Sequence, residues 1–175
     1  MNEFALTHCI RVDAFGATEF ETLNRLCESS AMVKFGLPQR VYVENEWYDG
    51  PRAGVADING LPHRFKSLFD EKEDQYLGTF IVWPIDKLEL ERELEQWWIF
   101  VQWKTLYETG KADTQSHPGQ GGINARWDEL EVLLQPSRAA ATTKQKRANA
   151  EMIPIDREPR YAESGPAYAL SWAIL

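Results

Sequence analysis

One stretch, from Asp86 to Gly110, constrains the fold of this chain more than any other. It begins with a pattern typical of a helix start, Asp86 followed three residues later by Glu89. In this pattern the side chain of the first residue accepts a hydrogen bond from a backbone N–H that has no partner within the helix. The sequence then changes to the run WWIFV over residues 97–101. A helix that is apolar on every side must be covered on every side, by its own domain or by a partner. The pattern predicts one long helix over about residues 86–109, ended by Gly110.

Two features of that helix guide its interpretation. The acidic residues at its start lie near the positive end of the helix dipole, and we expect Glu89, Glu91 and Glu93 on a solvated face. We interpret the WWIFV run as part of a core helix between a sheet and a second helix, rather than as a ridge that binds a partner. The reason is that two predicted strands, 76–83 and 168–174, have apolar faces that must pack against another element. On the core interpretation, alanine in place of Trp98 or Phe100 costs about 3–5 kcal/mol.

Alternation of apolar and polar residues predicts strands on both sides of the helix. It is clearest over residues 4–15 and 168–174, and we expect these two strands to lie close together. Between them a three- or four-stranded antiparallel meander is predicted, with one turn at Asn59-Gly60, where both residues tolerate positive φ. Its strands cover residues 41–44, 54–58, 61–69 and 76–83. The last of these is apolar on both faces and is predicted to be a central strand covered on both sides.

The sequence therefore predicts a single α+β domain over residues 1–175: a mainly antiparallel sheet of five to seven strands, a long helix packed across it and shorter helices. Thr18 and Glu21 form a capping box for a helix ending near Ser30. A further helix is predicted over residues 124–134. Residues 137–149 are either a mobile linker or a short solvated helix, and we favour the linker before a C-terminal strand pair.

Charge argues against general nucleic-acid binding. The net charge is −8, and residues 1–136 carry 23 acidic against 13 basic side chains. Such a body repels a phosphate backbone. An acidic surface suits a basic protein partner, or keeps a protein soluble without any partner.

No membrane span or cofactor is indicated. No run approaches the ~20 apolar residues of a spanning helix. The first residues lack the basic start and long apolar run of a signal peptide, and only two cysteines occur, Cys9 and Cys27. We therefore expect a reduced, cytoplasmic protein. We expect no metal, because His8, His63 and His117 show no metal-ligand spacing. The glycine-bearing segment 117–122 lacks a nucleotide-binding pattern and is interpreted as a connector between helices.

The best candidate for a binding site is the turn over residues 44–52. It offers aromatic rings for stacking, carboxylates for a cationic group and an arginine for an anion, on a loop fixed by a rigid sheet. The alternative is an ordinary surface hairpin with solvated acids. The candidate binding residues are Glu44, Glu46, Trp47, Tyr48, Asp49 and Arg52.

A catalytic alternative adds the Asn59-Gly60 hairpin. There Asp57 and His63 flank the turn and could hold a general base, although a cross-strand surface contact is the commoner outcome. No nucleophile motif such as G-x-S-x-G is present. If the protein is an enzyme, we expect a hydrolase whose catalytic residues are Glu44, Glu46, Asp57 and His63.

Three functional hypotheses follow. The leading one is a small acidic protein-binding or inhibitory module, resembling an immunity protein or an inhibitor of a basic, nucleic-acid-handling enzyme, with Trp47 and Tyr48 as anchors. The second is the hydrolase. The third is a structural or accessory domain of a larger assembly, which requires the long helix to expose Trp98 or Phe100. The sequence does not define an oligomeric state.

Overall fold

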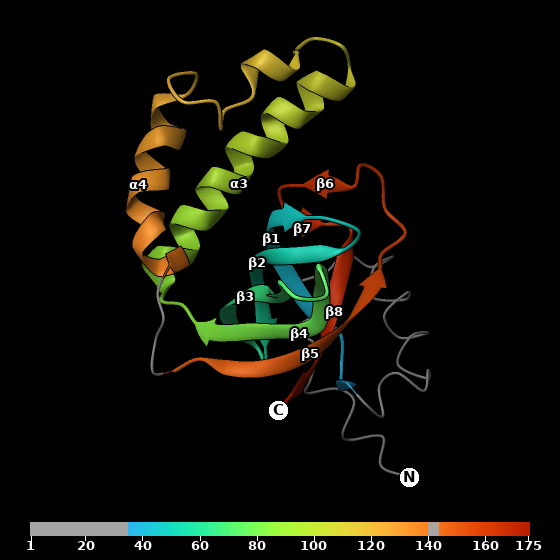
Figure 1. Cartoon of the computed structure of the whole chain (residues 1–175). Helices are drawn as coiled ribbons and strands as arrows, with labels where there is room; N and C mark the ends of the chain where they lie inside the picture. Colours follow the sequence, from blue (N-terminus) through green and yellow to red (C-terminus); the bar gives the residue numbers. More distant parts are fainter. Residues whose placement is uncertain (1–34, 140–143) are drawn as a thin grey trace.

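The structure, a computed structural model, describes residues 35–139 and 144–175. Six antiparallel strands close into a barrel in the order β1-β2-β3-β4-β5-β8, and a hairpin of two helices stands beside it (Figure 1). The barrel strands are β1 Gln39–Trp47, β2 Pro51–Ile58, β3 Leu61–Asp70, β4 Gln75–Pro84, β5 Lys146–Pro154 and β8 Tyr168–Ile174. The other elements are α3 Lys87–Glu108, η2 Thr114–Ser116, α4 Ala125–Ala139, β6 Tyr161–Ala162 and β7 Gly165–Pro166.

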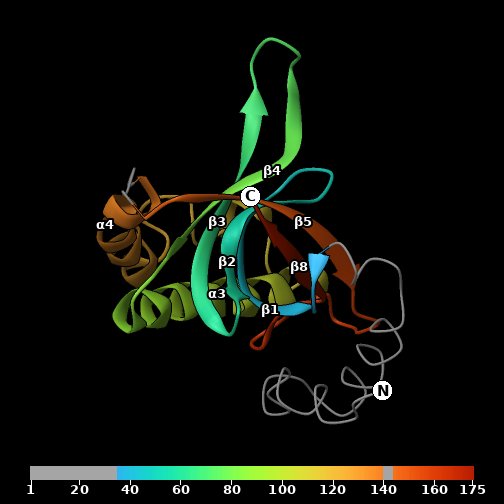
Figure 2. The same cartoon turned by 90° about the horizontal axis from the view of Figure 1, so that it is seen from below.

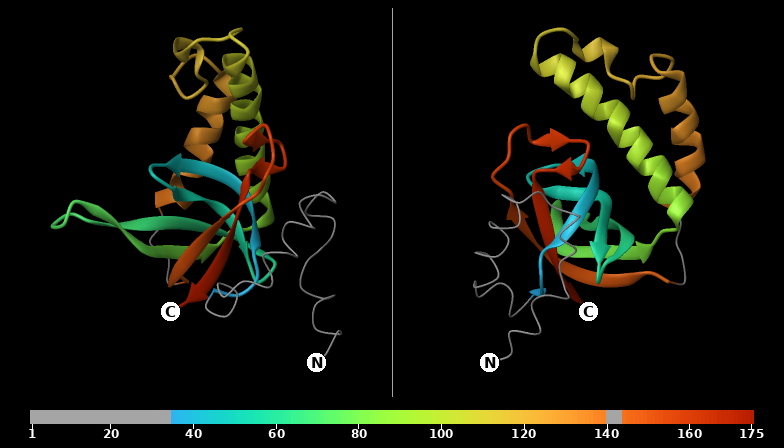
Figure 3. Two further views of the ribbon diagram at one scale, coloured as in Figure 1. Left: turned by 90° about the vertical axis from the view of Figure 1, so that its right-hand side faces the viewer. Right: turned by 180° about the vertical axis from the view of Figure 1, so that it is seen from behind.

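The α+β class and the mainly antiparallel sheet are confirmed, and its six strands fall within the predicted five to seven. One finer expectation, that the long helix packs across the sheet, is wrong. The sheet is closed, because β8 pairs with both β1 and β5. The long helix therefore has no open sheet face to cross, and it leans along the outside of the barrel beside α4 (Figures 1 and 3). The strand predicted over residues 4–15 and the helix predicted at residues 18–30 lie outside the described residues.

The two ends of α3 form as their residues predict. The Asp86 side chain accepts a hydrogen bond from the Glu89 backbone N–H at 2.8 Å. Gly110 takes φ +70°, a left-handed conformation that ends the helix without the strain a Cβ would add. The WWIFV run divides between core and surface. Trp97 and Val101 are buried, Ile99 and Phe100 are half-buried, and Trp98 is exposed, so the expected core role of Trp98 is wrong.

Three rings lie together in the apolar core inside the barrel. Phe65, Phe80 and Trp172 lie with centroids 5.7 to 5.9 Å apart, in tilted and edge-to-face arrangements. A bulge in β1 between Val41 and Val43 puts these two valines on opposite faces. Val41 joins the interior, whereas Val43 packs outside against α3 with Trp97. Val43 thus contributes to an apolar patch on the outside of the barrel, against which α3 packs.

The hairpin of β3 and β4 extends beyond the barrel as an arm, which we define as residues 67–78 (Figure 2; Figure 3, left). Pairing of β2 with β3 ends at Lys66, and pairing of β5 with β4 begins at Thr79. The prediction of a strand covered on both sides over 76–83 is thus confirmed only for its inner part, where Phe80, Val82 and Trp83 are buried.

Regular structure occupies both ends of the predicted linker over residues 137–149. Ser137 and Arg138 belong to α4, which runs to Ala139, and β5 begins at Lys146. Residues 140–143 lie outside the described part of the chain. The Asn59-Gly60 turn forms as predicted, with φ of 54° and 73° at its two residues.

Candidate functional site

The six predicted binding residues lie on two different surfaces. Bulges near the end of β1 turn successive side chains away from strict alternation. Glu44 and Trp47 line a cleft between β1 and the helices. Tyr48, Asp49 and Arg52 line a separate hollow against the arm. Glu46 lines the cleft and also accepts a hydrogen bond from the hydroxyl of Tyr76, on the arm, at 3.3 Å.

The Glu44 carboxylate is the centre of a compact polar cluster. It accepts hydrogen bonds from the Arg160 guanidinium at 3.0 Å and from the Tyr161 hydroxyl at 3.1 Å. Arg160 also stacks on the Trp47 ring, with its guanidinium carbon 3.9 Å from the ring centroid. Burial raises the pKa of Glu44 more than Arg160 and Tyr161 lower it, and burial likewise raises the pKa of Tyr161 to about 12. The cluster joins β1 to the segment that leads into β6.

The cleft has a volume of about 230 Å³. Five aromatic side chains from β1, α3, the loop after η2 and α4 line it: Trp47, Trp97, Phe100, His117 and Trp127. Its charged side chains are three carboxylates, Glu44, Glu46 and Glu131, and one guanidinium, that of Arg138. Burial lowers the pKa of His117, whose Nδ1 accepts a hydrogen bond from the Gly119 N–H at 2.9 Å, so this ring is neutral at pH 7.

A buried ion network fixes the helices to the barrel. The side chain of Glu93 on α3 is fully buried between Arg64 on β3, at 2.7 Å, and Arg138 on α4, at 2.8 Å. Arg64 also pairs with Glu89, and Arg138 with Glu131. The expectation that Glu93 lies on a solvated face is therefore wrong. This network therefore joins three elements, β3, α3 and α4, and two of its residues, Glu131 and Arg138, also line the cleft.

The network predicts a specific pH dependence of stability. Burial alone would raise the pKa of Glu93, but the hydrogen bonds and charges of Arg138 and Arg64 outweigh it and hold that pKa below the ordinary 4.5. The stabilisation is therefore complete above pH 4.5 and is lost as the pH falls from there toward the pKa in the folded state. We expect denaturant unfolding to show a smaller loss of stability on acidification in Glu93→Gln than in the unmodified protein. Parallel pH profiles would contradict this assignment.

The second surface, which we call the arm surface, is a hollow of about 510 Å³ lined by Tyr48, Asp49, Arg52, Phe69, Asp74, Gln75 and Tyr76. The ring of Tyr76 is central to it. Phe69 lies edge-on at 5.0 Å, Tyr48 at 6.1 Å, and the Arg52 guanidinium stacks 4.2 Å above it. Tyr48 is 68% exposed and Phe69 45% exposed. Four of the five residues at the tip of the arm, 70–74, are acidic.

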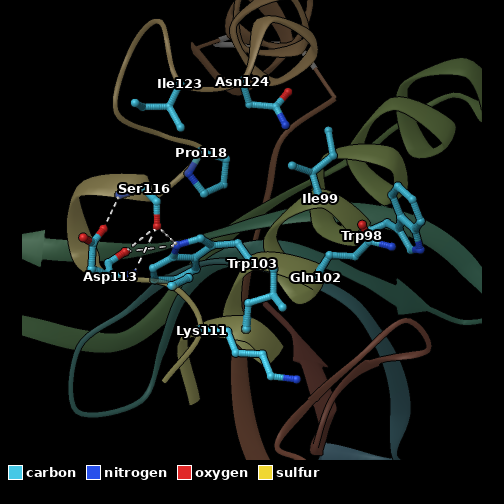
Figure 4. Close-up of a pocket in the computed structure, with 12 residues that line it drawn as sticks. Trp98, Ile99, Gln102, Trp103, Lys111, Asp113, Ser116, Pro118, Ile123 and Asn124 are labelled. Atoms are coloured by element: carbon cyan, nitrogen blue, oxygen red, sulfur yellow. Dashed lines mark hydrogen bonds between the residues drawn. The ribbon is translucent and has the colours of Figure 1, made fainter. Parts of the chain in front are cut away.

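A third hollow, of about 540 Å³, lies on the outer side of the helical hairpin (Figure 4). Ile99 and Trp103 from α3 lie opposite Pro118 and Ile123 from the connection to α4, and Trp98 lines the edge of the hollow. The Trp103 indole N–H donates to Ser116 Oγ at 3.3 Å, which holds η2 against the helix. We call this hollow the outer groove.

The remaining catalytic candidates do not join Glu44. In the β2–β3 pairing Asp57 is opposite Pro62 and His63 is opposite Ala56. Adjacent positions point to opposite faces of a sheet, so Asp57 and His63 lie on opposite faces. The Tyr42 hydroxyl donates to the Asp57 carboxylate at 3.1 Å, and His63 Nδ1 contacts the Leu61 carbonyl at 2.8 Å. Only Glu44 and Glu46 of the four candidates share a surface, the cleft.

Several residues of these surfaces were not predicted. Phe69 and Tyr76 flank a polar loop at hairpin spacing, which could have indicated paired rings at an exposed tip. Arg138 and Arg160 meet acidic partners more than 40 residues away, at Glu93 and Glu44. Such long-range pairs leave no local pattern in a single sequence.

Within residues 35–139 and 144–175, no group of three or more His, Cys, Asp or Glu side chains is arranged to hold a metal ion. No helix in the same ranges is both long and apolar enough to cross a membrane. Comparison with models of protein families, with curated proteins and with solved structures finds no match.

Proposed function

We propose that this protein is an acidic protein-binding module that holds a basic protein partner through the arm surface. The observation that carries the proposal is the exposed ring cluster around Tyr76, on an arm that projects from a rigid barrel. Clustered aromatic and arginine side chains provide most of the binding energy in protein interfaces, and here Arg52 already lies over the Tyr76 ring.

Charge supports a basic partner. Asp49 and Asp74 line the arm surface, and Asp70, Glu71 and Glu73 lie beside it at the tip, against Lys72 and Arg52. The net charge of the whole chain is −8. An acidic rim speeds encounter with a basic protein and makes the association rate fall with salt. Phe69 and Tyr76 replace Trp47, which was expected as an anchor, because Trp47 lines the cleft and not the arm surface.

The test is a binding measurement with matched variants. The full protein is used as bait, each captured protein is purified, and its affinity is measured by calorimetry. For the true partner we expect a basic protein whose affinity falls about 30-fold or more in Tyr76→Ala, as at an interface hot spot, and changes little in Tyr76→Phe. We also expect Asp74→Lys to slow association.

The control variant is Trp98→Ala, which removes a ring of similar size from the outer groove. A partner lost in Trp98→Ala and retained in Tyr76→Ala would overturn the arm proposal and favour the accessory-domain hypothesis, which Trp98 supports because 44% of it is exposed. An acidic partner would contradict the proposal. So would a partner whose affinity is the same for Tyr76→Ala, Trp98→Ala and the unmodified protein. The hydrolase hypothesis has less support, because Asp57 and His63 face away from each other across the sheet.

A further inference from the structure

The cleft between β1 and the helices has aromatic walls. Four rings form a continuous series in the order Trp97, Phe100, His117 and Trp127. The centroids of successive rings lie 5.4, 6.2 and 6.1 Å apart. Trp97 is fixed by its indole N–H, which donates to the Ala162 carbonyl at 2.8 Å. In the part of the chain that the structure describes, no cation lies over Trp97, Phe100 or Trp127.

The charges of the cleft favour a positive ligand. Arg138 is the one cationic residue among the described residues that line the cleft, and both Glu93 and Glu131 bind it at 2.8 Å. At the rim Glu46 is exposed, and its described partner is a neutral one, the Tyr76 hydroxyl. The neutral His117 adds no positive charge. Carboxylates at the rim of an aromatic wall attract a cation and repel an anion.

The chain itself already binds a cation by this chemistry at the edge of the cleft. The Arg160 guanidinium stacks 3.9 Å from the centroid of Trp47, and its charge is met by Glu44 at 3.0 Å. The aromatic side chains of Trp97, Phe100 and Trp127 line the same cleft as the Glu46 carboxylate, and among residues 35–139 and 144–175 no cation lies over these three rings. At about 230 Å³ the cleft is smaller than the roughly 300–1,000 Å³ pockets that hold drug-sized molecules, so it suits a small molecule or one head group.

We propose that the cleft between β1 and the α3–α4 hairpin binds a small organic cation with an alkylated ammonium head, held by the faces of Trp97, Phe100 and Trp127 and by the carboxylate of Glu46. An alkylated ammonium is weakly hydrated and needs no hydrogen-bond acceptor at each corner. Aromatic faces supply its attraction, as in other sites for quaternary ammonium ligands. This site is distinct from the arm surface, so it does not rest on the proposed function.

The experiment titrates the full protein with choline and, separately, with its neutral isostere in which carbon replaces nitrogen. Tryptophan fluorescence and calorimetry record binding. We expect saturable binding of choline, about tenfold or more tighter than that of the isostere, because only the cation is attracted by ring faces and carboxylates. Equal binding of the two compounds, or no saturation by choline, would overturn the proposal.

Variants locate the site. Glu46→Gln removes one exposed charge without disturbing the core and is expected to weaken choline binding about threefold, whereas Trp127→Ala should abolish it. Tyr48→Ala on the arm surface and Trp98→Ala in the outer groove should leave it unchanged. If Trp127→Ala fails to fold, the Glu46→Gln result decides the matter. Choline binding that is unaffected by Glu46→Gln, or lost in Trp98→Ala, would place the ligand elsewhere and contradict the proposal.

Discussion

Glu93→Ala is expected to destabilise the protein by about 3–5 kcal/mol, because it removes the fully buried carboxylate that two guanidinium groups share and leaves each of them only its more exposed partner, Glu89 or Glu131. Arg64 is 3% exposed and loses its 2.7 Å partner, and Arg138 loses a carboxylate that it contacts through two nitrogens. Alanine also leaves a void between β3, α3 and α4, which adds a cavity cost. The measurement is the free energy of unfolding from urea denaturation at pH 7.

The matched control is Glu91→Ala, the same change two residues earlier on the same helix. The Glu91 side chain is 57% exposed and contacts Lys87 at 3.5 Å. Exposed pairs of this kind contribute little, and we expect a loss below about 0.5 kcal/mol. Similar losses in the two variants would show that the network does not hold the helices to the barrel. Because total stability is typically about 5–15 kcal/mol, the difference should be easy to measure.

These two glutamates also show how far the sequence determines the site. Both follow Asp86 in the same acidic stretch, and nothing local distinguishes them. Their environments differ because Arg64 and Arg138, distant in sequence, arrive on one side of α3. Whether a charge is buried thus depends on segments that are distant in the sequence. A single sequence does not show that these segments come together in the fold. The capping of α3, by contrast, depends on neighbours three residues apart, and it was predictable.

The same distinction applies to the sheet. Turn chemistry at Asn59-Gly60 fixes a hairpin locally, so the register of β2 with β3 follows from the sequence. Closure of the barrel needs β8 to meet β1 at Gln39↔Leu170, a pairing between distant segments. The sequence pattern does not predict the bulge between Val41 and Val43 either, because two valines two positions apart fit an ordinary half-buried strand without a bulge. The strands predicted over residues 41–83 and 168–174 were therefore found, whereas the closure of the sheet into a barrel was not predicted.

Trp97→Ala is expected to cost about 3–5 kcal/mol, as for other buried rings. Trp97 is 3% exposed, packs with Val43 on the barrel wall and meets Tyr161 at 5.8 Å. Its indole N–H also donates to the Ala162 carbonyl, which loses its partner in the variant. The side chain thus joins α3, the barrel and the segment that carries β6, and its removal leaves a cavity bordered by all three.

Trp98→Ala, one residue further, is expected to cost less than about 1 kcal/mol. Its ring lines the outer groove, and its indole N–H donates to the exposed Glu163 carboxylate at 3.0 Å. Thermal and urea unfolding of the two variants measures the difference. A run that is apolar on every side gives no periodicity from which to choose the buried ring, so this pair tests the orientation of α3 itself. A larger loss of stability in Trp98→Ala than in Trp97→Ala would mean that α3 is rotated about its axis. The cleft would then be lined by other residues of α3 than Trp97 and Phe100.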